Sequence, residues 1–270
     1  MNRKTGFPAS FNLFAAIAAF LFASILNSTA AAQTQKAPTR SLLEVTIVSV
    51  RPEMAMDFET LIKTEYNPAF VKGGGKQSAV WQTAAFGPAF DIIFVEPIER
   101  MSQYDGPSSL EKGLGKDGAG AFFAKASKMV TNVRSYAVET RPDLSFMANP
   151  NSMPRMAVVS HIRVAQNRDA EFENYIRNEW LPVIKQAGIP GYLMHRMIFG
   201  GDANEYVSLA LADNFADIEK GPPVARVLGS DGMLKLMQKM PSGAVLGIER
   251  NIVRLNNDLS VFPAQPTAKK

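Results

Sequence analysis

The chain has 270 residues and no Cys, and 20% of its residues are charged. Lys and Arg number 29 against 25 Asp and Glu, and the two signs are interspersed along the sequence. This balance argues against nucleic acid or an anionic membrane as a partner. Because no disulfide can form, the fold must be stabilised by a packed core, which a chain of this length can build as one or two domains.

The first 32 residues have the pattern of an export signal. A basic start with Arg3 and Lys4 precedes a mostly apolar run at 13–26, and three small Ala residues at 30–32 suit cleavage. The run is short for a membrane span of roughly 20 residues, so a retained anchor is the weaker interpretation. We therefore predict a periplasmic or secreted protein of residues 33–270, without membrane contact after cleavage. Without Arg3 and Lys4, its 27 Lys and Arg nearly balance its 25 Asp and Glu.

Residues 41–145 are predicted to form a first unit, in the order strand, helix, strand, strand, helical region, strand. The predicted strands are rich in β-branched and other apolar residues; they are "LEVTIVSV" (43–50), "SAVWQTAAF" (78–86), "DIIFVE" (91–96) and "VRSYAVET" (133–140). The first helix follows from Asp57. Several Gly interrupt the second helical region, 107–129, which favours short helices over one long helix.

Residues 156–260 repeat this order as a second unit. Its predicted strands are "MAVVSHIRV" (156–164), "YLMHRMIF" (192–199), "EYVSLAL" (205–211) and "IERNIVRL" (248–255), and the middle two form a hairpin. A Gly-interrupted helical region is again expected, at 222–240. The stretch 146–155, rich in Asn and Pro, is the predicted linker between the units, and 261–270 is expected to be a flexible tail.

The two units match residue by residue at an offset of 114 positions. The first partners are Val45, Phe58, Glu59, Ile62, Glu65, Tyr66 and Pro68, which correspond to Val159, Phe172, Glu173, Ile176, Glu179, Trp180 and Pro182. One inserted residue later, "DLS" at 143–145 matches "DLS" at 258–260. A register kept over roughly a hundred residues indicates a duplication.

The order βαββαβ indicates an α+β fold of the ferredoxin-like type, an antiparallel sheet with helices on one face. The other face is bare and must be buried. Two such units packed sheet to sheet would form a pseudo-dimeric α/β barrel. In this respect the sequence resembles the dimeric α/β-barrel superfamily, which includes antibiotic-biosynthesis-monooxygenase-like and NIPSNAP-like proteins, as a tandem repeat. The resemblance covers nearly all of residues 33–270 and matches no specific catalytic motif. Pairing of bare faces between chains, giving a homodimer, is left open.

Both predicted first helices contain a Glu followed by an aromatic residue, any residue and Pro. At 100° per residue, Glu65 lies within about 20° of Phe58, on the apolar stripe of its helix. Glu179 has the same position relative to Phe172 in the second helix. A carboxylate there is costly unless it is paired or hydrogen-bonded, and burial raises its pKa. In one interpretation Pro68 and Pro182 bend or restart the helices, and the Glu accepts hydrogen bonds from backbone N–H groups exposed at the restart. In the other, Glu65, Glu179 or both line a ligand site.

The two His residues, His161 and His195, both lie in the second unit, where the first has Ile47 and Trp81. Strand alternation lets both face the barrel interior. The superfamily includes haem binders, so the resemblance implies a His as a conceivable axial haem ligand; a His satisfied in the core or at the surface is the alternative. No spacing of metal ligands is present, and we predict no metal and no cofactor.

Two hypotheses for the function follow. The resemblance implies a small-molecule-binding protein with its pocket in the barrel, between sheet and helices, and within that class a cofactor-independent oxygenase-like enzyme for an apolar or aromatic compound. The alternative is a non-catalytic exported module that binds a ligand or a partner protein. Glu179 and His161 are the catalytic candidates; the expected ligand-binding residues are Glu65, Tyr66, Trp81, His161, Trp180, His195, Arg196 and Tyr206. A pocket holding a carboxylate of raised pKa with a His in hydrogen-bond reach would favour the enzyme.

Overall fold

The computed structural model describes residues 40–149 and 154–263. The predicted export signal, the middle of the predicted linker and most of the predicted tail lie outside these ranges. Within the described ranges, no helix is both long and apolar enough to cross a membrane.

The first half of the described chain has the predicted βαββαβ order. Its strands are β1 (Leu42–Val50), β2 (Ala79–Ala85), β3 (Asp91–Ile98) and β4 (Val130–Thr140). Between β1 and β2 lie η1 (Pro52–Met54), α1 (Ala55–Leu61), η2 (Ile62–Tyr66) and α2 (Asn67–Lys72). Between β3 and β4 lie η3 (Met101–Asp105) and α3 (Ser109–Met129), and η4 (Pro142–Leu144) follows β4.

The second half repeats the order after a short strand β5 (Phe146–Met147), which pairs with β7. Its strands are β6 (Met156–Val164), β7 (Gly191–Phe199), β8 (Glu205–Ala212) and β9 (Val245–Leu255). Its helical segments are α4 (Asp169–Tyr175), η5 (Ile176–Trp180), α5 (Leu181–Ile184), α6 (Phe215–Glu219) and α7 (Pro223–Gln238).

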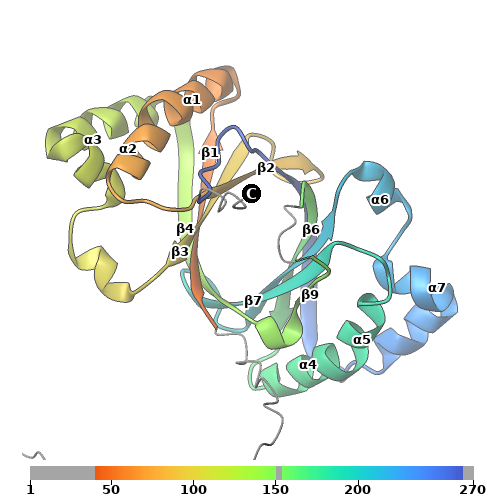
Figure 1. Ribbon diagram of the computed structural model, residues 1–270. Helices are drawn as coiled ribbons and strands as arrows, with labels where there is room; N and C mark the ends of the chain where they lie inside the picture. Colours follow the sequence, from red (N-terminus) through yellow and green to blue (C-terminus); the bar gives the residue numbers. More distant parts are fainter. Residues whose placement is uncertain (1–39, 150–153, 264–270) are drawn as a thin grey trace, which may run out of the picture. The chain divides into compact units, whose positions relative to one another are not determined.

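The eight long strands close into one antiparallel barrel. The strand order is β4-β1-β3-β2-β9-β6-β8-β7, and β7 returns to β4. Each half contributes four strands in ferredoxin-like order, and the halves join edge to edge at β2–β9 and β4–β7. The predicted pseudo-dimeric α/β barrel is thereby confirmed, and it closes within one chain. Helices α1–α3 lie outside one side of the barrel and α4–α7 outside the other (Figure 1).

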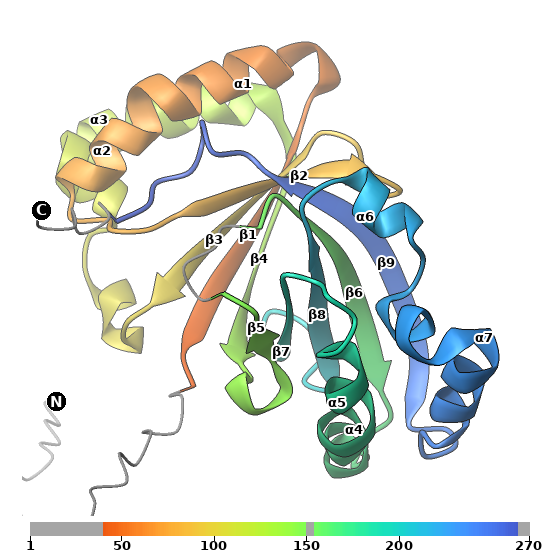
Figure 2. The ribbon, with the colours of Figure 1, turned by 45° about the vertical axis from the view of Figure 1, so that its right-hand side comes forward.

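Strand alternation divides each sheet between two environments. On β1, Val48 packs outward against the helices, whereas Val45 faces the barrel interior. On β6, Ile162 packs outward, and Val159 packs inward in a cluster with Leu211 of β8. The faces left bare by the helices are thus buried against each other across the barrel, as the sequence predicts. The turned view shows how the helices cover only the outer faces (Figure 2).

A π-helical turn precedes the Pro in the first helix of each half. In η2 the amide of Asn67 bonds to the carbonyl of Ile62, and in η5 the amide of Leu181 bonds to the carbonyl of Ile176. Pro has no amide donor and crowds the carbonyl four residues back. A turn bonded over five residues widens the helix at this point. The repeated Glu-aromatic-x-Pro combination therefore marks a shared local widening of the helix.

Both second helices are kinked by one glycine at matching positions. Gly115 in α3 has φ 75°, and Gly229 in α7 has φ 70°. Only glycine adopts this left-handed backbone readily. The expected interruption of the two Gly-rich regions is confirmed, and the kinks lie 114 positions apart, as the repeat requires.

Each half also places a short trailing segment in the other half. Leu144, directly after β4, is fully buried in the hydrophobic core of the second half. Leu259, after β9, is fully buried in the core of the first half. Both belong to the repeated Asp-Leu-Ser sequence. Each half therefore packs the Asp-Leu-Ser segment of the other, and this reciprocal exchange joins the halves.

The Ser of each exchanged segment completes the joint. Ser145 Oγ accepts the amide hydrogen of Met194 at 2.8 Å, and Ser260 Oγ accepts that of Val80 at 2.8 Å. Met194 and Val80 are themselves 114 positions apart. The two joints are thus related by the same pseudo-symmetry as the barrel.

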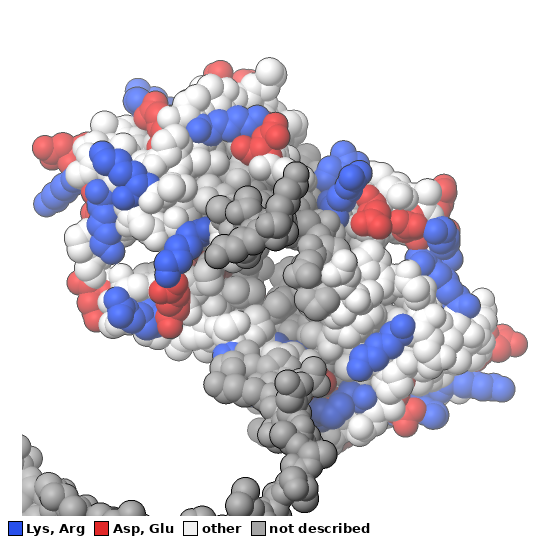
Figure 3. Space-filling view, viewed as in Figure 1, with Lys and Arg blue, Asp and Glu red and all other residues white. Residues whose placement is uncertain are grey.

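Charges of both signs are mixed on the face of the molecule seen in Figure 3, without a block of Lys and Arg or of Asp and Glu. This agrees with the interspersed charges in the sequence.

Candidate functional site

A cavity lies in each half, between the outer face of the sheet and the helices that cover it. The N-terminal cavity has a volume of about 670 Å³ and the C-terminal cavity about 850 Å³. Both volumes lie in the range of small-molecule sites, roughly 300–1,000 Å³. Both cavities lie between sheet and helices, as the sequence predicts, but on the outer face of the sheet and not in the barrel interior.

The floor of the N-terminal cavity carries two neighbouring carboxylates. Glu44 on β1 lies opposite Glu96 on β3, and both side chains line the cavity. Each accepts a hydrogen bond from a Tyr: Tyr66 Oη donates to Glu96 at 3.1 Å, and Tyr104 Oη donates to Glu44 at 2.7 Å. Two Glu–Tyr pairs therefore stand side by side on one wall.

Burial changes the proton affinity of the inner Glu–Tyr pair. Burial raises the pKa of Glu96 above its usual value, the hydrogen bonds from Ser78 and Tyr66 lower it in part, and the neighbouring charge of Glu44 raises it further. Burial and the charge of Glu96 raise the pKa of Tyr66 well above 10.0. Tyr66 therefore stays a hydrogen-bond donor, and Glu96 can gain or lose a proton closer to neutral pH than an exposed Glu.

The rest of the N-terminal cavity is largely aromatic around Tyr66. The ring of Tyr66 is stacked with Phe70 at a centroid distance of 5.7 Å, and it meets Phe94 and Phe122 at 5.9 Å each. All four residues line the cavity. Such a wall suits a flat apolar ligand whose polar hydrogen points to the carboxylates.

The C-terminal cavity has hydroxyl, indole and guanidinium donors in place of the two carboxylates. Ser160 on β6 lies opposite both Ser208 on β8 and Arg250 on β9, and all three line the cavity. Tyr192 and Trp180 complete this polar wall. Burial raises the pKa of Tyr192 to about 12, so its hydroxyl remains protonated. Trp180 Nε1 is buried, lies close enough to the Tyr192 hydroxyl to lower that pKa, and makes no hydrogen bond of normal geometry with the described residues.

The two cavities use equivalent positions of the repeat for different chemistry. At the offset of 114, the residues Glu44, Glu96, Tyr66 and Tyr104 correspond to Val158, Ala210, Trp180 and Ile218. The register agrees, because Val158 lies opposite Ala210 as Glu44 lies opposite Glu96. Only the aromatic position is kept in both halves.

Of the residues that the sequence singles out, Tyr66 and Trp180 line the two cavities. Trp81, His161 and His195 are on strand positions that face the barrel interior, where Trp81 packs in the same cluster as Val159. The structure therefore brings the predicted set together in part, and it separates both His residues from the cavities.

Glu65 and Glu179 do not line the cavities and do not face the core. Their side chains are 37% and 38% exposed, and each forms an ion pair of 2.7 Å, with Lys125 and Lys239 respectively. The π turn holds one more residue than an α-turn, which rotates the following side chains away from the ideal 100° positions. This is why the expected place of both carboxylates on the apolar stripe is wrong.

The two His residues have different surroundings inside the barrel. His161 Nδ1 lies 2.5 Å from a carboxylate oxygen of Glu205. His195 Nδ1 is buried without a partner among the described residues, and burial lowers the pKa of His195 to about 4. Because neither cavity is lined by a His, neither supplies an imidazole ligand to a haem. The described residues also contain no group of three or more His, Cys, Asp or Glu that could hold a metal ion.

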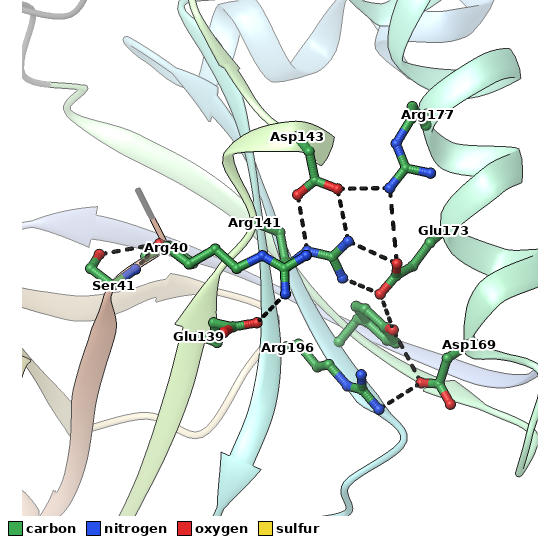
Figure 4. A network of polar contacts seen from close by, with 11 residues as sticks. Arg40, Ser41, Glu139, Arg141, Asp143, Asp169, Glu173, Arg177 and Arg196 are labelled. Carbon is green, nitrogen blue, oxygen red and sulfur yellow. Dashed lines mark hydrogen bonds and ion pairs between the residues drawn. The ribbon is translucent and has the colours of Figure 1, made fainter. Parts of the chain in front are cut away.

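Arg196 and Tyr206 belong to an ion network at the joint between β4 and α4 (Figure 4). Arg141, only 2% exposed, binds Glu173 through both terminal nitrogens. Tyr206 Oη donates to Glu173 at 2.8 Å and to Asp169 at 3.1 Å, and Arg196 pairs with Asp169 at 3.3 Å. The pair of Arg141 with Glu173 holds the first half to the second, whereas the contacts of Tyr206 and Arg196 lie within the second half. Neither Arg196 nor Tyr206 lines the cavity.

Sequence reasoning missed most of the polar residues in the cavities: Glu44, Glu96, Tyr104, Ser160, Tyr192, Ser208 and Arg250. Their signal is strand alternation. Glu44 is in phase with the outward Val48, and Glu96 with the outward Phe94, so each carboxylate lies on the face that helices cover. A polar residue in that phase indicates a cavity or a buried polar group.

No protein-family model matches the chain, and no curated protein matches it in sequence. Solved structures do match it in fold. A candidate monooxygenase from Lactobacillus acidophilus is 11% identical with a TM-score of 0.52, over 83% of this chain and 97% of that chain. An anthrone oxidase-like protein is 9% identical with a TM-score of 0.57, over 82% and 93%. A candidate monooxygenase from Fusobacterium nucleatum is 13% identical with a TM-score of 0.50, over 79% and 91%. With two βαββαβ halves that close one barrel, the chain has the dimeric α/β-barrel fold in tandem form.

Proposed function

We propose that the N-terminal cavity binds a small apolar or aromatic molecule with a weakly acidic O–H or C–H group, and that Glu96 removes this proton. The observation that carries the proposal is a partly buried carboxyl with a raised pKa, hydrogen-bonded to Tyr66 inside an aromatic cavity. A general base works best when its pKa lies near the working pH. Perturbed carboxyl groups in a cleft are a common mark of functional sites.

The surrounding residues divide the work between positioning and electrostatics. Tyr66 donates a hydrogen bond to one oxygen of Glu96, and a second hydrogen bond, from Ser78, also helps to hold the carboxyl in place. Glu44, held by Tyr104, raises the proton affinity of Glu96. The aromatic wall orients the ligand and keeps water away, which strengthens the interaction between the carboxylate and the reacting proton.

An oxygenase-like reaction is the catalytic extension of this proton transfer. A CH₂ group of the ligand would lose one proton to Glu96, and the carbanion would be oxidised by O₂ to a carbonyl, with water as the second product. The described activities of the neighbours, monooxygenase-like and anthrone oxidase-like, support an oxygen-using reaction on a compound of this class. This chain supplies the base, the donor and the apolar enclosure for it.

Anthrone, an apolar aromatic compound with an acidic CH₂ group, is the test ligand. In D₂O without O₂, NMR would follow exchange of its CH₂ protons; in the presence of O₂, absorbance would follow the quinone. Glu96→Gln is expected to slow the exchange by about 10²–10⁴-fold. Glu53→Gln, which makes the same charge change at an exposed residue outside the cavity, should have no effect.

Exchange that is as fast in Glu96→Gln as in the wild type would contradict the assignment of Glu96. Binding of anthrone without any exchange in the wild type would instead support the non-catalytic binding module. Tyr66→Phe separates ligand binding from proton removal, because it keeps the ring that contacts the ligand and removes the hydrogen bond to Glu96.

We also propose that the protein acts outside the cytoplasm, on the basis of the N-terminal signal pattern in residues 1–32. Mass spectrometry of the protein from separated cell fractions tests this. A chain that begins near residue 33 in the periplasmic or secreted fraction is expected, and an uncleaved chain in the cytoplasm would overturn the proposal.

A further inference from the structure

We propose that the C-terminal cavity is a second binding site, separate from the N-terminal one, and that it takes an apolar molecule carrying a single carboxylate. The two cavities are copies of one ancestral position, but their floors differ in charge. This inference does not depend on proton transfer in the N-terminal cavity.

The carboxylates of the N-terminal floor are absent from the C-terminal floor. Val158 and Ala210 occupy the positions of Glu44 and Glu96 and lie opposite each other in the same register. The two Glu residues of the N-terminal floor would repel a carboxylate ligand. The C-terminal floor has no negative charge at these positions. On the last strand of the second half, by contrast, a positive charge replaces a neutral residue of the first half.

Arg250 of β9 is in the place that Ser135 of β4 has in the first half. Ser135 lies opposite Thr46, and Arg250 lies opposite Ser160, the counterpart of Thr46. Ser135 forms a hydrogen bond of 2.7 Å with Thr46. The guanidinium of Arg250 makes no ion pair or hydrogen bond with the described residues, and its charge lowers the pKa of the nearby Tyr192 in part. A free guanidinium at the edge of an apolar cavity is a binding group for a carboxylate.

Further donors surround this guanidinium. Ser160 and Ser208 are buried and continue the row from Arg250 across the sheet, and the Ser208 hydroxyl also hydrogen-bonds Tyr192. Trp180 Nε1 is buried near the Tyr192 hydroxyl, but it makes no hydrogen bond of normal geometry with the described residues. A buried donor without an acceptor is costly, so a ligand oxygen at this wall would be stabilised. One carboxylate has enough lone pairs to accept from several of these groups at once.

The charged residues around the cavity also favour an anion. Four cations and two carboxylates line it: Lys185, Lys220, Arg226, Arg250, Asp213 and Asp217. Lys220 is paired with Asp217 at 2.7 Å, and Arg226 donates to the main-chain carbonyls of Gly221 and Asp217. Arg250 and Lys185 therefore face a ligand with only Asp213 to oppose them.

The remaining wall suits the apolar body of such a ligand. Trp180, Tyr175 and Ile184 line one side, and Met233, Met237 and Met240 line the other. Methionine side chains are flexible and polarisable and adapt to ligands of different shape. The larger volume, about 850 Å³, leaves room for a two-ring or medium-chain acid.

Calorimetric titration with 2-naphthoate and with the neutral 2-naphthamide tests the proposal on the purified full chain. The two probes share the ring system and differ in charge. The wild type should bind naphthoate about tenfold or more tightly than naphthamide, as expected for a charged hydrogen bond. Arg250→Gln should remove this preference by weakening only naphthoate.

Two matched variants locate the effect. Arg254→Gln removes the same charge from the same strand, but Arg254 is outside the cavity, so the preference should remain. Glu96→Gln changes the N-terminal floor and should also leave it unchanged. The proposal is overturned if the wild type binds neither probe or binds both equally, if Arg250→Gln keeps the preference, or if only Glu96→Gln alters it. Circular dichroism checks that Arg250→Gln, at an exposed side chain, remains folded.

Discussion

Replacement of Arg141 by Gln should destabilise the barrel more than replacement of Asn256 by Ala at the equivalent joint on the other side. Arg141 is 2% exposed and binds two carboxylates, those of Asp143 and Glu173. Removing one partner of a buried ion pair costs about 3–5 kcal/mol, because the other charge is left without compensation. Glu173 keeps its hydrogen bond from Tyr206 and an ion pair of 3.9 Å with Arg177, and Asp143 keeps its ion pair of 2.7 Å with Arg177. We therefore expect the lower end, about 3 kcal/mol.

The opposite joint offers a matched control. Asn256 has the place of Arg141, since its amide bonds to Val80 as that of Arg141 bonds to Met194. Its side chain makes only neutral hydrogen bonds, to Gln82 at 2.9 Å and from the amide of Leu259 at 3.1 Å. Asn256→Ala should cost about 1–2 kcal/mol at roughly 1 kcal/mol per hydrogen bond.

Urea unfolding followed by circular dichroism measures both differences, and thermal unfolding should show a loss of about 6–12 °C for Arg141→Gln. The hydrogen bonds from Arg141 hold the pKa of Asp143 well below its usual range. Burial raises the pKa of Glu173, but the hydrogen bonds from Arg141 and Tyr206 outweigh burial, so the net pKa of Glu173 is lowered. Carboxyl groups with lowered pKa stabilise the fold above their unfolded pKa and lose this effect as the pH falls. The gap to the wild type should therefore narrow below about pH 4. An Arg141→Gln cost no larger than that of Asn256→Ala would refute the reasoning.

Further substitutions and one titration test other features of the fold and the site. Gly115→Ala and Gly229→Ala should each cost about 1–2 kcal/mol in urea unfolding, because an added Cβ meets nothing within 4 Å at either site and only the left-handed backbone resists it; very unequal costs would speak against equivalent kinks. Glu96→Gln should raise the unfolding temperature at neutral pH. Because the folded pKa of Glu96 is raised, the wild type is most stable below the unfolded pKa of this Glu, and its stability falls as the pH rises through the folded pKa. The gain should vanish near pH 4 in a series of thermal scans. His195 should titrate near pH 4 by NMR, since burial lowers its pKa to about 4; a value near 6.5 would show that water reaches it.

The fold could be predicted because the duplication and the strand pattern agree. The offset of 114 positions placed both units, and the element order within each indicated the ferredoxin-like sheet. The Gly-rich regions predicted the interruptions that Gly115 and Gly229 produce. The exchanged Asp-Leu-Ser segments were visible as a repeat, but their role was not, because a local pattern does not state which half a buried Leu enters.

The site could be predicted only in part. Tyr66 and Trp180 were found through the repeated helix sequence, and they line the cavities. Glu65 and Glu179 were misplaced because the prediction used an ideal α-helix, and the π turn before each Pro changes the rotation. Glu44 and Glu96 were missed because alternation assigns residues to two faces without telling which face the helices cover. That choice depends on packing between distant segments.

The most direct test of the account is the pKa of Glu96, measured by NMR titration of carboxyl-labelled Glu, with Glu96→Gln to assign the signal and Glu99 as the internal reference. Burial raises the pKa of Glu96, whereas the ion pair with Lys76 lowers that of Glu99. The account predicts that Glu96 titrates at higher pH than Glu99 and shifts when an aromatic ligand binds. Titration of Glu96 at or below the pH of Glu99, without any response to ligand, would contradict it.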